Sequence, residues 1–205
     1  MGGRRALDDF HHELLRLAYQ LIFLFVAEDR DALLERPGPK AKKAEVKANQ
    51  AARERYALYF STARLRRIAS CRKGDHNTDL WEGLKHVLNA LGRDGGEPAL
   101  ALPGLGGLYY LPEPSEIDED ARPTRLPGGA EPLRAAKLLN ERLLEAVRLL
   151  SRIKEKGRTT RVDYRHLGAE ELGSVYESSW SSCRPVRPTT RSSNSRTSTR
   201  ATSAS

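Results

Sequence analysis

Hydrophobic side chains recur every three or four residues along the first part of the chain, which predicts a helix from about Leu7 to Leu34. Its apolar face consists of Phe10, Leu14, Leu17, Leu21 and either Leu24 or Phe25. Asp8 or Asp9 is the expected cap, because a carboxylate accepts hydrogen bonds from the free amides at a helix start. The Pro-Gly-Pro run at 37–39 is expected to end the helix.

Two further helices follow from the same periodicity. Residues from Lys40 to Ala69 are rich in helix formers; the first half is polar on all sides, and the second half is amphipathic. The other helix runs from Asp79 to Leu91, with Asn77 or Thr78 as its cap. Its predicted buried stripe is Leu80, Trp81, Leu84, Val87, Leu88 and Leu91.

The second half of the chain is dense in glycine and proline from Gly92 to Pro132. Within it, LALPGLGGLYYLPEP is predicted to be ordered, and EIDEDARPTRLPGGAEP to be an exposed loop. A fourth helix is expected from Leu133 to about Lys156 and a last one from Ala169 to Ser178. Since no segments of alternating polarity indicate a sheet, we predict a mainly α fold, an irregular helical bundle or connector over residues 1–178.

Composition changes abruptly after Ser178. Residues 179–205 contain no Leu, Lys, Asp, Glu or Gly and are rich in Ser, Arg and Thr, which predicts a disordered C-terminal tail. The whole chain has a formal charge of +8, but five arginines lie in this tail, which leaves +3 for the rest. The predicted helical domain is therefore only mildly basic.

The two cysteines and the longest apolar run indicate where in the cell the protein is located. Cys71 and Cys183 are too few for a disulfide framework or a structural zinc site, so a cytoplasmic location is expected. The apolar run from Ala18 to Ala27 is about half the roughly 20 residues that a membrane span needs. We therefore interpret it as part of a buried helix and expect no membrane partner.

Several catalytic or ligand-binding patterns can be tested against the sequence. Gly104, Gly106 and Gly107 lack the spacing of a dinucleotide-binding loop, so an ordered turn with close backbone contacts is the favoured interpretation. A metal-dependent nuclease motif could be assembled only from Glu45 and Lys47 with Asp29 and Asp31 upstream. Because Glu45 and Lys47 fall in an alanine- and lysine-rich helix, a solvated charged face is the favoured interpretation.

The histidines are interpreted as surface or partly buried side chains, because none is placed at the i, i+4 offset of a helical zinc site: His11, His12, His76, His86 and His166. No arrangement of nucleophile, base and stabilising donor is apparent. The sequence predicts no catalytic, cofactor-binding or metal-binding residue in this chain.

Two basic clusters near aromatic residues are candidates for DNA-backbone contacts, since positive side chains neutralise phosphates and release counterions. The first surrounds Tyr56, Tyr59 and Phe60, and the second lies beside Tyr164. The candidate residues are Arg64, Arg66, Arg67, Arg72, Lys73, Arg158, Arg161 and Arg165. Plain solvated helix faces have a similar composition, so that alternative stays open.

Five segments, in order, resemble one protein family: LAYQLIFLFVAEDRDALL, YFSTARLRRIA, DLWEGLKHVLNAL, LALPGLGGLYY and VDYRHLGAEELGSVYES. They are similar to the helical region ahead of the methyltransferase core in type IIG-like bacterial restriction-modification proteins. Members of that family fuse a DNA endonuclease to an adenine-N6 DNA methyltransferase and act in phage defence. The similarity covers roughly Leu14 to Ser178, and LGSVYES is its most specific part.

The resemblance implies DNA as a partner and S-adenosylmethionine as the cofactor of the intact family. A methyltransferase of this kind needs a glycine-rich cofactor loop and an Asn-Pro-Pro-Tyr-like motif that holds a flipped adenine. Neither motif occurs here, so the expectation is a truncated segment that is inactive alone and lacks its catalytic domain. The competing hypothesis is a free-standing helical DNA-binding or interaction protein with a basic tail.

The composition break has two explanations under the resemblance. In the family, LGSVYES typically continues as Leu-Leu-Glu-Leu, and GC-rich codons for that continuation read Ser-Trp-Ser-Ser-Cys when shifted by one base. These are residues 179–183 of this chain, so a frameshift near codon 178 is the favoured hypothesis. A genuine disordered tail is the alternative.

Overall fold

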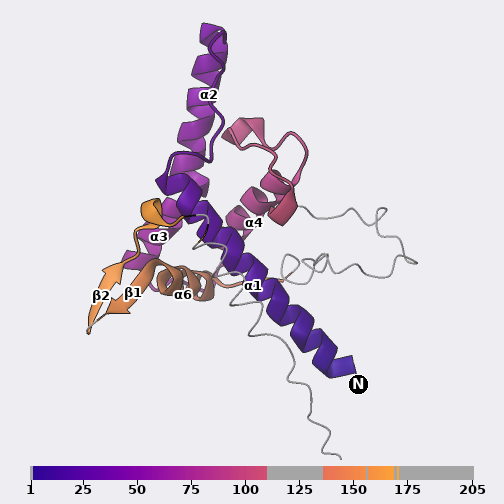
Figure 1. Cartoon of the computed structure of the whole chain (residues 1–205), viewed down its shortest axis with the longest axis vertical. Helices are drawn as coiled ribbons and strands as arrows, with labels where there is room; N and C mark the ends of the chain where they lie inside the picture. The colour runs from indigo at the N-terminus through magenta and orange to yellow at the C-terminus, as the bar shows by residue number, and fades with distance from the viewer. Residues whose placement is uncertain (1, 110–135, 156, 169, 171–205) are drawn as a thin grey trace, which may run out of the picture.

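The computed structural model describes residues 2–109, 136–155, 157–168 and 170. Figure 1 shows a mainly helical molecule, in which α1 runs diagonally, α2 projects from one end, and a small hairpin lies beside α3 and α6. The α-helices are α1 (Gly2–Asp29), α2 (Lys43–Arg55), α3 (Thr62–Cys71), α4 (Asp79–Gly92) and α6 (Asn140–Ser151). The predicted mainly α fold is confirmed.

The first helix begins at Gly2, so the predicted cap at Asp8 or Asp9 is wrong, because both positions lie inside the helix. It ends at Asp29, five residues before the predicted end at Leu34. The backbone turns where Asp31 adopts a left-handed conformation, with φ of 49°, and Ala32 N donates to Ala27 O at 2.9 Å. The predicted core face is confirmed at Leu21, Leu24 and Phe25, which are buried, and is wrong at Phe10 and Leu14, which are 46% and 42% exposed. Within the described ranges, no helix combines the length and apolar character that crossing a membrane requires.

The single helix predicted from Lys40 to Ala69 is wrong, because the chain is interrupted at Ser61. There α2 continues into a π-helical turn, η1 (Tyr56–Phe60), and Ser61 is extended, with φ of −66° and ψ of 145°. Its Oγ accepts a hydrogen bond from Arg64 N at 3.2 Å, which is the behaviour of an N-cap. Helix α3 therefore starts as a new element at Thr62.

The hydrophobic core is built from the buried faces of α1, α3, α4 and α6. The stripe predicted on α4 is buried at every position except Leu80, which is partly buried. Other fully buried side chains of this core come from distant segments: Leu24, Phe25, Tyr56, Leu102, Tyr109, Leu143, Leu144 and Val147. One continuous core thus joins the two halves of the described chain.

Residues 98–109 form an ordered segment with two short 3-10 turns. The first, η2 (Pro98–Leu100), packs on α2, and the second, η3 (Gly107–Tyr109), packs on α4 and α1. Leu105 N and Gly106 N donate to Leu91 O at 2.8 and 3.1 Å, which satisfies a carbonyl at the end of α4. The predicted ordered turn with close backbone contacts is confirmed. The exposed loop predicted after Pro114 lies outside the described residues.

Replacing Gly104 with alanine is expected to lower the free energy of unfolding by about 2 kcal/mol. The added Cβ would be 2.9 Å from Gly95 N and in closer conflict with the Arg93 carbonyl oxygen. Gly38→Ala is the matched control, since no atom lies within 4 Å of its added Cβ. Urea titration followed by circular dichroism tests this expectation, and equal losses of stability in the two variants would contradict it.

The fourth predicted helix also differs from the structure. It begins at Asn140, and at Arg152 the chain leaves the helix for an antiparallel hairpin of β1 (Arg152–Glu155) and β2 (Arg158–Arg161). Arg152 pairs with Arg161 and Ile153 with Thr160. The absence of strands was a wrong prediction, because four-residue strands are too short to show a clear alternation. The helix predicted from Ala169 to Ser178 and the tail from 179 to 205 lie outside the described residues, except that residue 170 is helical.

Candidate nucleic-acid interface

The N-terminus of α3 is held by a carboxylate from α1. Glu28 Oε1 accepts hydrogen bonds from Tyr56 Oη at 2.6 Å and Thr62 N at 2.7 Å, and Glu28 Oε2 accepts one from Ala63 N at 2.7 Å. Burial, followed by the nearby charge of Glu28, raises the pKa of the Tyr56 hydroxyl, which therefore stays a proton donor at neutral pH. This anion-binding position is already occupied by the protein's own side chain.

Arg66, a predicted DNA contact, lies inside the molecule. Its guanidinium donates to both carboxylate oxygens of Asp29, at 3.0 and 2.6 Å, and lies 4.8 Å from the ring centroid of Phe25. The Arg66 side chain is only 3% exposed. The prediction for this residue is corrected: a bidentate partner 37 residues earlier in the chain draws Arg66 into the core.

Asp29 lies at the point where the two predicted basic clusters approach each other. Its pKa is lowered, chiefly by the hydrogen bonds from Arg66 and also by the positive charges of Arg161 and Arg165. Burial of the carboxyl group opposes this shift. Positive side chains from both predicted clusters therefore act on this one carboxylate, although Arg66 alone is hydrogen-bonded to it.

The remaining residues of the first cluster lie along α3 and just after it. Arg67, Arg72 and Lys73 are exposed, whereas Arg64 is half-buried and donates to Tyr59 O at 3.3 Å. The end of α3 is positioned by Arg148 of α6, which donates to the carbonyl oxygens of Ala69 and Arg72 at 2.9 and 3.0 Å. The backbone at Arg72 is thus held in place while its side chain faces solvent.

An open cavity of about 450 Å³ lies between the end of α1, the π-helical turn and the start of α3. Arg64 and Arg67 line it together with the carboxylates of Glu28 and Asp31. The mixture of signs makes this cavity less suited to a phosphate than the surface near the hairpin.

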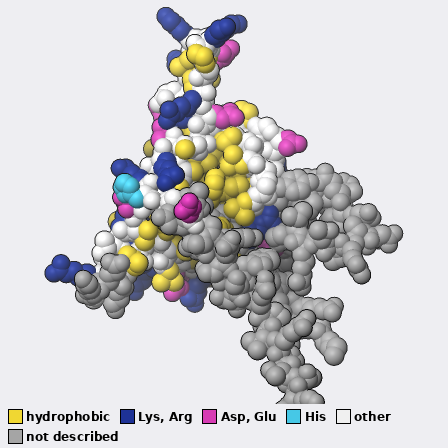
Figure 2. Space-filling view, in the orientation of Figure 1, with side chains coloured by type: hydrophobic (Ala, Val, Ile, Leu, Met, Phe, Trp, Pro, Cys, Tyr) yellow, Lys and Arg dark blue, Asp and Glu magenta, His cyan; other side chains and the backbone are white. Residues whose placement is uncertain are grey.

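The second cluster is divided between the two faces of the hairpin. Arg161 is directly opposite Arg152, so these two side chains share one face, whereas Arg158 is an odd number of residues from Arg161 and lies on the other. All four residues of β2 are exposed. Figure 2 shows Lys and Arg side chains near the hairpin and along the adjacent edge of the molecule.

Arg152 is a candidate contact that the sequence analysis missed. The sequence predicts that Arg152 lies within a helix, in which it would not face Arg161. In this hairpin, the positive charges of Arg152 and Arg161 are directly opposite each other, which destabilises the strand pairing unless an anion lies nearby. Only the register of the two strands could have indicated this residue.

The aromatic residues of the clusters have mainly structural positions. Tyr56 is buried, and Phe60 packs against His86 with ring centroids 5.6 Å apart. Tyr164 is buried against Phe25 and donates to Leu150 O at 2.5 Å. Tyr59 differs from them, because it is 63% exposed and free to stack on a base or another planar group.

The other candidate chemistries are not supported by the geometry of the described residues. Asp29 and Asp31 are engaged by arginines, and Glu45 accepts a hydrogen bond from Lys42 N at 3.1 Å. Among the residues placed by the structure, no group of three His, Cys, Asp or Glu side chains could hold a metal ion. His166 is exposed, and its Nε2 lies 3.8 Å from Oδ2 of Asp163, which is also exposed.

No protein-family model matches this sequence, and no curated protein or solved structure matches it either. Inference about function therefore depends on the sequence resemblance and on the geometry of the basic surface.

Proposed function

We propose that this chain is the helical region ahead of the methyltransferase core of a type IIG-like restriction-modification protein, and that it contacts the DNA backbone. The segments similar to that family include α3, α4 and the segment that packs on α1. Adenine methylation and the binding of S-adenosylmethionine would belong to a separate catalytic domain. The chain alone would bind DNA without modifying it.

The observation that best supports the DNA contact is the like-charge pair on the hairpin. Arg152 and Arg161 are exposed and directly opposite each other, and Arg161 and Arg165 both act on the same carboxylate as Arg66. A DNA phosphate close to this pair would relieve the repulsion. Because such contacts are made to phosphates, they would be tolerant of sequence and sensitive to salt.

We expect the variant Arg152→Gln, Arg161→Gln, Arg165→Gln to bind a DNA duplex at least about tenfold more weakly than the parent chain at low salt. The slope of log K against log salt should fall by about 2 to 3, one for each lost phosphate contact. Fluorescence anisotropy with a labelled duplex measures both quantities.

The matched control for this experiment removes the same number of positive charges from exposed side chains elsewhere: Arg93→Gln, Lys137→Gln and Arg142→Gln. It should reduce affinity much less than the hairpin variant, because a local contact depends on position and a net-charge effect does not. Equal losses in the two variants would contradict a hairpin interface.

The competing function is a free-standing DNA-binding protein that uses the five arginines of residues 179–205. It predicts that deleting this segment abolishes binding, whereas an interface on the hairpin predicts that most binding remains. Translating the genomic DNA after codon 170 in all three frames tests the relation to the restriction-modification family. A neighbouring frame that encodes a cofactor loop and an Asn-Pro-Pro-Tyr-like motif would support it, and the absence of both would count against it.

A further inference from the structure

Helix α2 projects from the body of the molecule as an arm, which we define as residues 40–51. Ala52 is the first buried residue of α2, and every side chain from Arg36 to Ala51 is exposed or partly exposed. Figure 1 shows the first turns of α2 extending beyond the other helices. The helix therefore gains little from core packing over most of its length.

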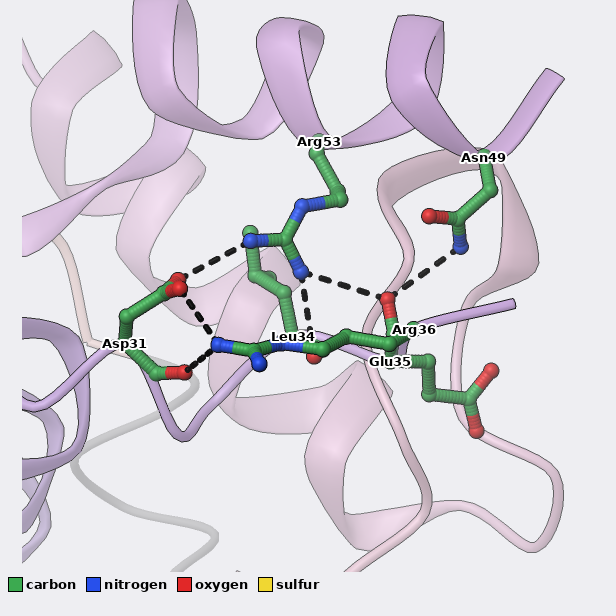
Figure 3. Close-up of polar contacts among 6 residues, drawn as sticks. All are labelled: Asp31, Leu34, Glu35, Arg36, Asn49 and Arg53. Carbon is green, nitrogen blue, oxygen red and sulfur yellow. Dashed lines mark hydrogen bonds and ion pairs between the residues drawn. The ribbon is translucent and has the colours of Figure 1, made fainter. Parts of the chain in front are cut away.

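The base of the arm is nevertheless firmly oriented, as Figure 3 shows. Arg53 donates to Asp31 Oδ1 at 2.9 Å and to the carbonyl oxygens of Leu34 and Glu35 at 3.2 and 3.3 Å. Asn49 Nδ2 donates to the same Glu35 oxygen at 3.2 Å. These contacts, together with a hydrogen bond from Arg55 to Ala99 O, tie α2 to the loop after α1 and to η2.

The arm has a concentrated positive charge. Four lysines lie within eight residues: Lys40, Lys42, Lys43 and Lys47. The one acid between Pro37 and Ala51 is Glu45, whose carboxylate accepts a hydrogen bond from the Lys42 amide. Within the described part of the chain, none of the four ammonium groups forms an ion pair. Figure 2 shows Lys and Arg side chains gathered at the end of this projection.

These lysines are placed where they oppose helix formation. Lys42 is the N-cap and Lys43 the first residue of α2, so both lie at the positive end of the helix dipole. Lys43 and Lys47 are four residues apart, which brings like charges together on one face. A helix selected for stability alone would have acids at these positions, and such local conflicts are expected at functional sites.

We propose that the arm binds the phosphate backbone of a DNA duplex through these four lysines. The choice of DNA as the polyanion rests on the proposed function; the positive, oriented and unpaired character of the arm does not. The free amides at the start of α2 and its dipole add to the attraction for phosphate. The arm would act as a second contact, separate from the hairpin and carried on a different element.

The test compares three variants of the full chain by fluorescence anisotropy with a labelled duplex over a range of salt concentrations. The arm variant is Lys42→Gln, Lys43→Gln, Lys47→Gln, in which glutamine preserves helix propensity. The other two are the hairpin variant and the Arg93, Lys137, Arg142 control described above. Far-ultraviolet circular dichroism should show no loss of helix content in any of the three.

We expect the arm variant to lose at least about tenfold in affinity and about 2 to 3 in the salt slope, with a much smaller change in the control. If the arm variant bound the duplex as tightly as the control variant, the arm proposal would be overturned. If the hairpin variant lost affinity in that same experiment, the proposed function would still stand. A parent chain that binds no duplex at low salt would overturn both.

Binding to vesicles of phosphatidylserine and phosphatidylcholine tests whether the arm binds an anionic membrane surface instead of DNA. We expect the parent chain and the arm variant to bind these vesicles equally, whereas the arm variant binds DNA more weakly than the parent. A loss by the arm variant on vesicles and not on DNA would overturn the proposal in favour of a membrane-surface contact.

Discussion

Replacing Asp29 with alanine is expected to lower the free energy of unfolding by about 3 kcal/mol, because it leaves a buried guanidinium without its counter-charge. The Arg66 side chain is 3% exposed, its two terminal nitrogens donate to Asp29, and its Nε has no hydrogen-bond partner within the described structure. Urea unfolding followed by circular dichroism measures the change.

Two comparisons make this prediction specific. Glu145→Ala removes an ion pair with Arg142 whose side chains are 51% and 65% exposed, and it should cost less than about 1 kcal/mol. The double variant Asp29→Ala, Arg66→Met should recover much of the lost stability, since it removes the buried guanidinium together with its counter-charge. If the Asp29 and Glu145 variants lost the same stability, the pair would not be a buried one.

The same ion pair determines a pH dependence. The pKa of Asp29 is lower in the folded chain than in the unfolded chain, mainly because of the hydrogen bonds from Arg66. The stability that it contributes is therefore fully present above the ordinary carboxyl pKa of about 3.9 and is lost as pH falls through the lower folded value. The difference in unfolding free energy between the parent chain and Asp29→Ala should narrow in this acid range and stay constant near neutral pH.

Replacing Glu28 with alanine is expected to cost about 3 kcal/mol of unfolding free energy, since hydrogen bonds to a charged acceptor are among the strongest in proteins. The change leaves the buried Tyr56 hydroxyl and the amides of Thr62 and Ala63 without their acceptor. The start of α3 would lose its cap and its link to α1 together. The same urea titration applies.

Glu35→Ala is the matched control, because Glu35 is exposed and takes part in the arm network only through its backbone oxygen. It should change stability by less than about 0.5 kcal/mol. Tyr56→Phe isolates the hydroxyl contribution and should cost about 1 kcal/mol. A Glu28 variant as stable as the Glu35 control would show that solvent caps α3 equally well.

Helical periodicity was a sufficient guide to the elements that bury a continuous stripe. The helix from Asp79 was predicted within one residue of its observed end at Gly92, because apolar side chains occur there throughout. The same signal failed at Ser61 and Arg152, where good helix formers continue across a real boundary. Periodicity describes which face is apolar and contains little information about where a backbone turns.

The candidate interface shows the same limit. Charge clustering identified Arg161 and Arg165, which are exposed and whose positive charges lower the pKa of Asp29, but it also selected Arg66, which is buried. Exposure could not be predicted, because the partner of Arg66 lies 37 residues away. Arg152 was missed because its significance depends on the strand opposite it.

Residue pattern alone was enough for the fold class, for the core face of α4 and for the ordered turn at Gly104, since each depends on neighbours close in the chain. The helix ends depended on contacts between segments far apart in sequence. Glu28 caps the start of α3, and Asn140 Oδ1 accepts from Leu80 N at 3.2 Å near the start of α4, where the predicted cap Thr78 makes no side-chain cap. A free amide at a helix end needs an acceptor, but any nearby oxygen can serve, so its identity emerges only when the chain has packed.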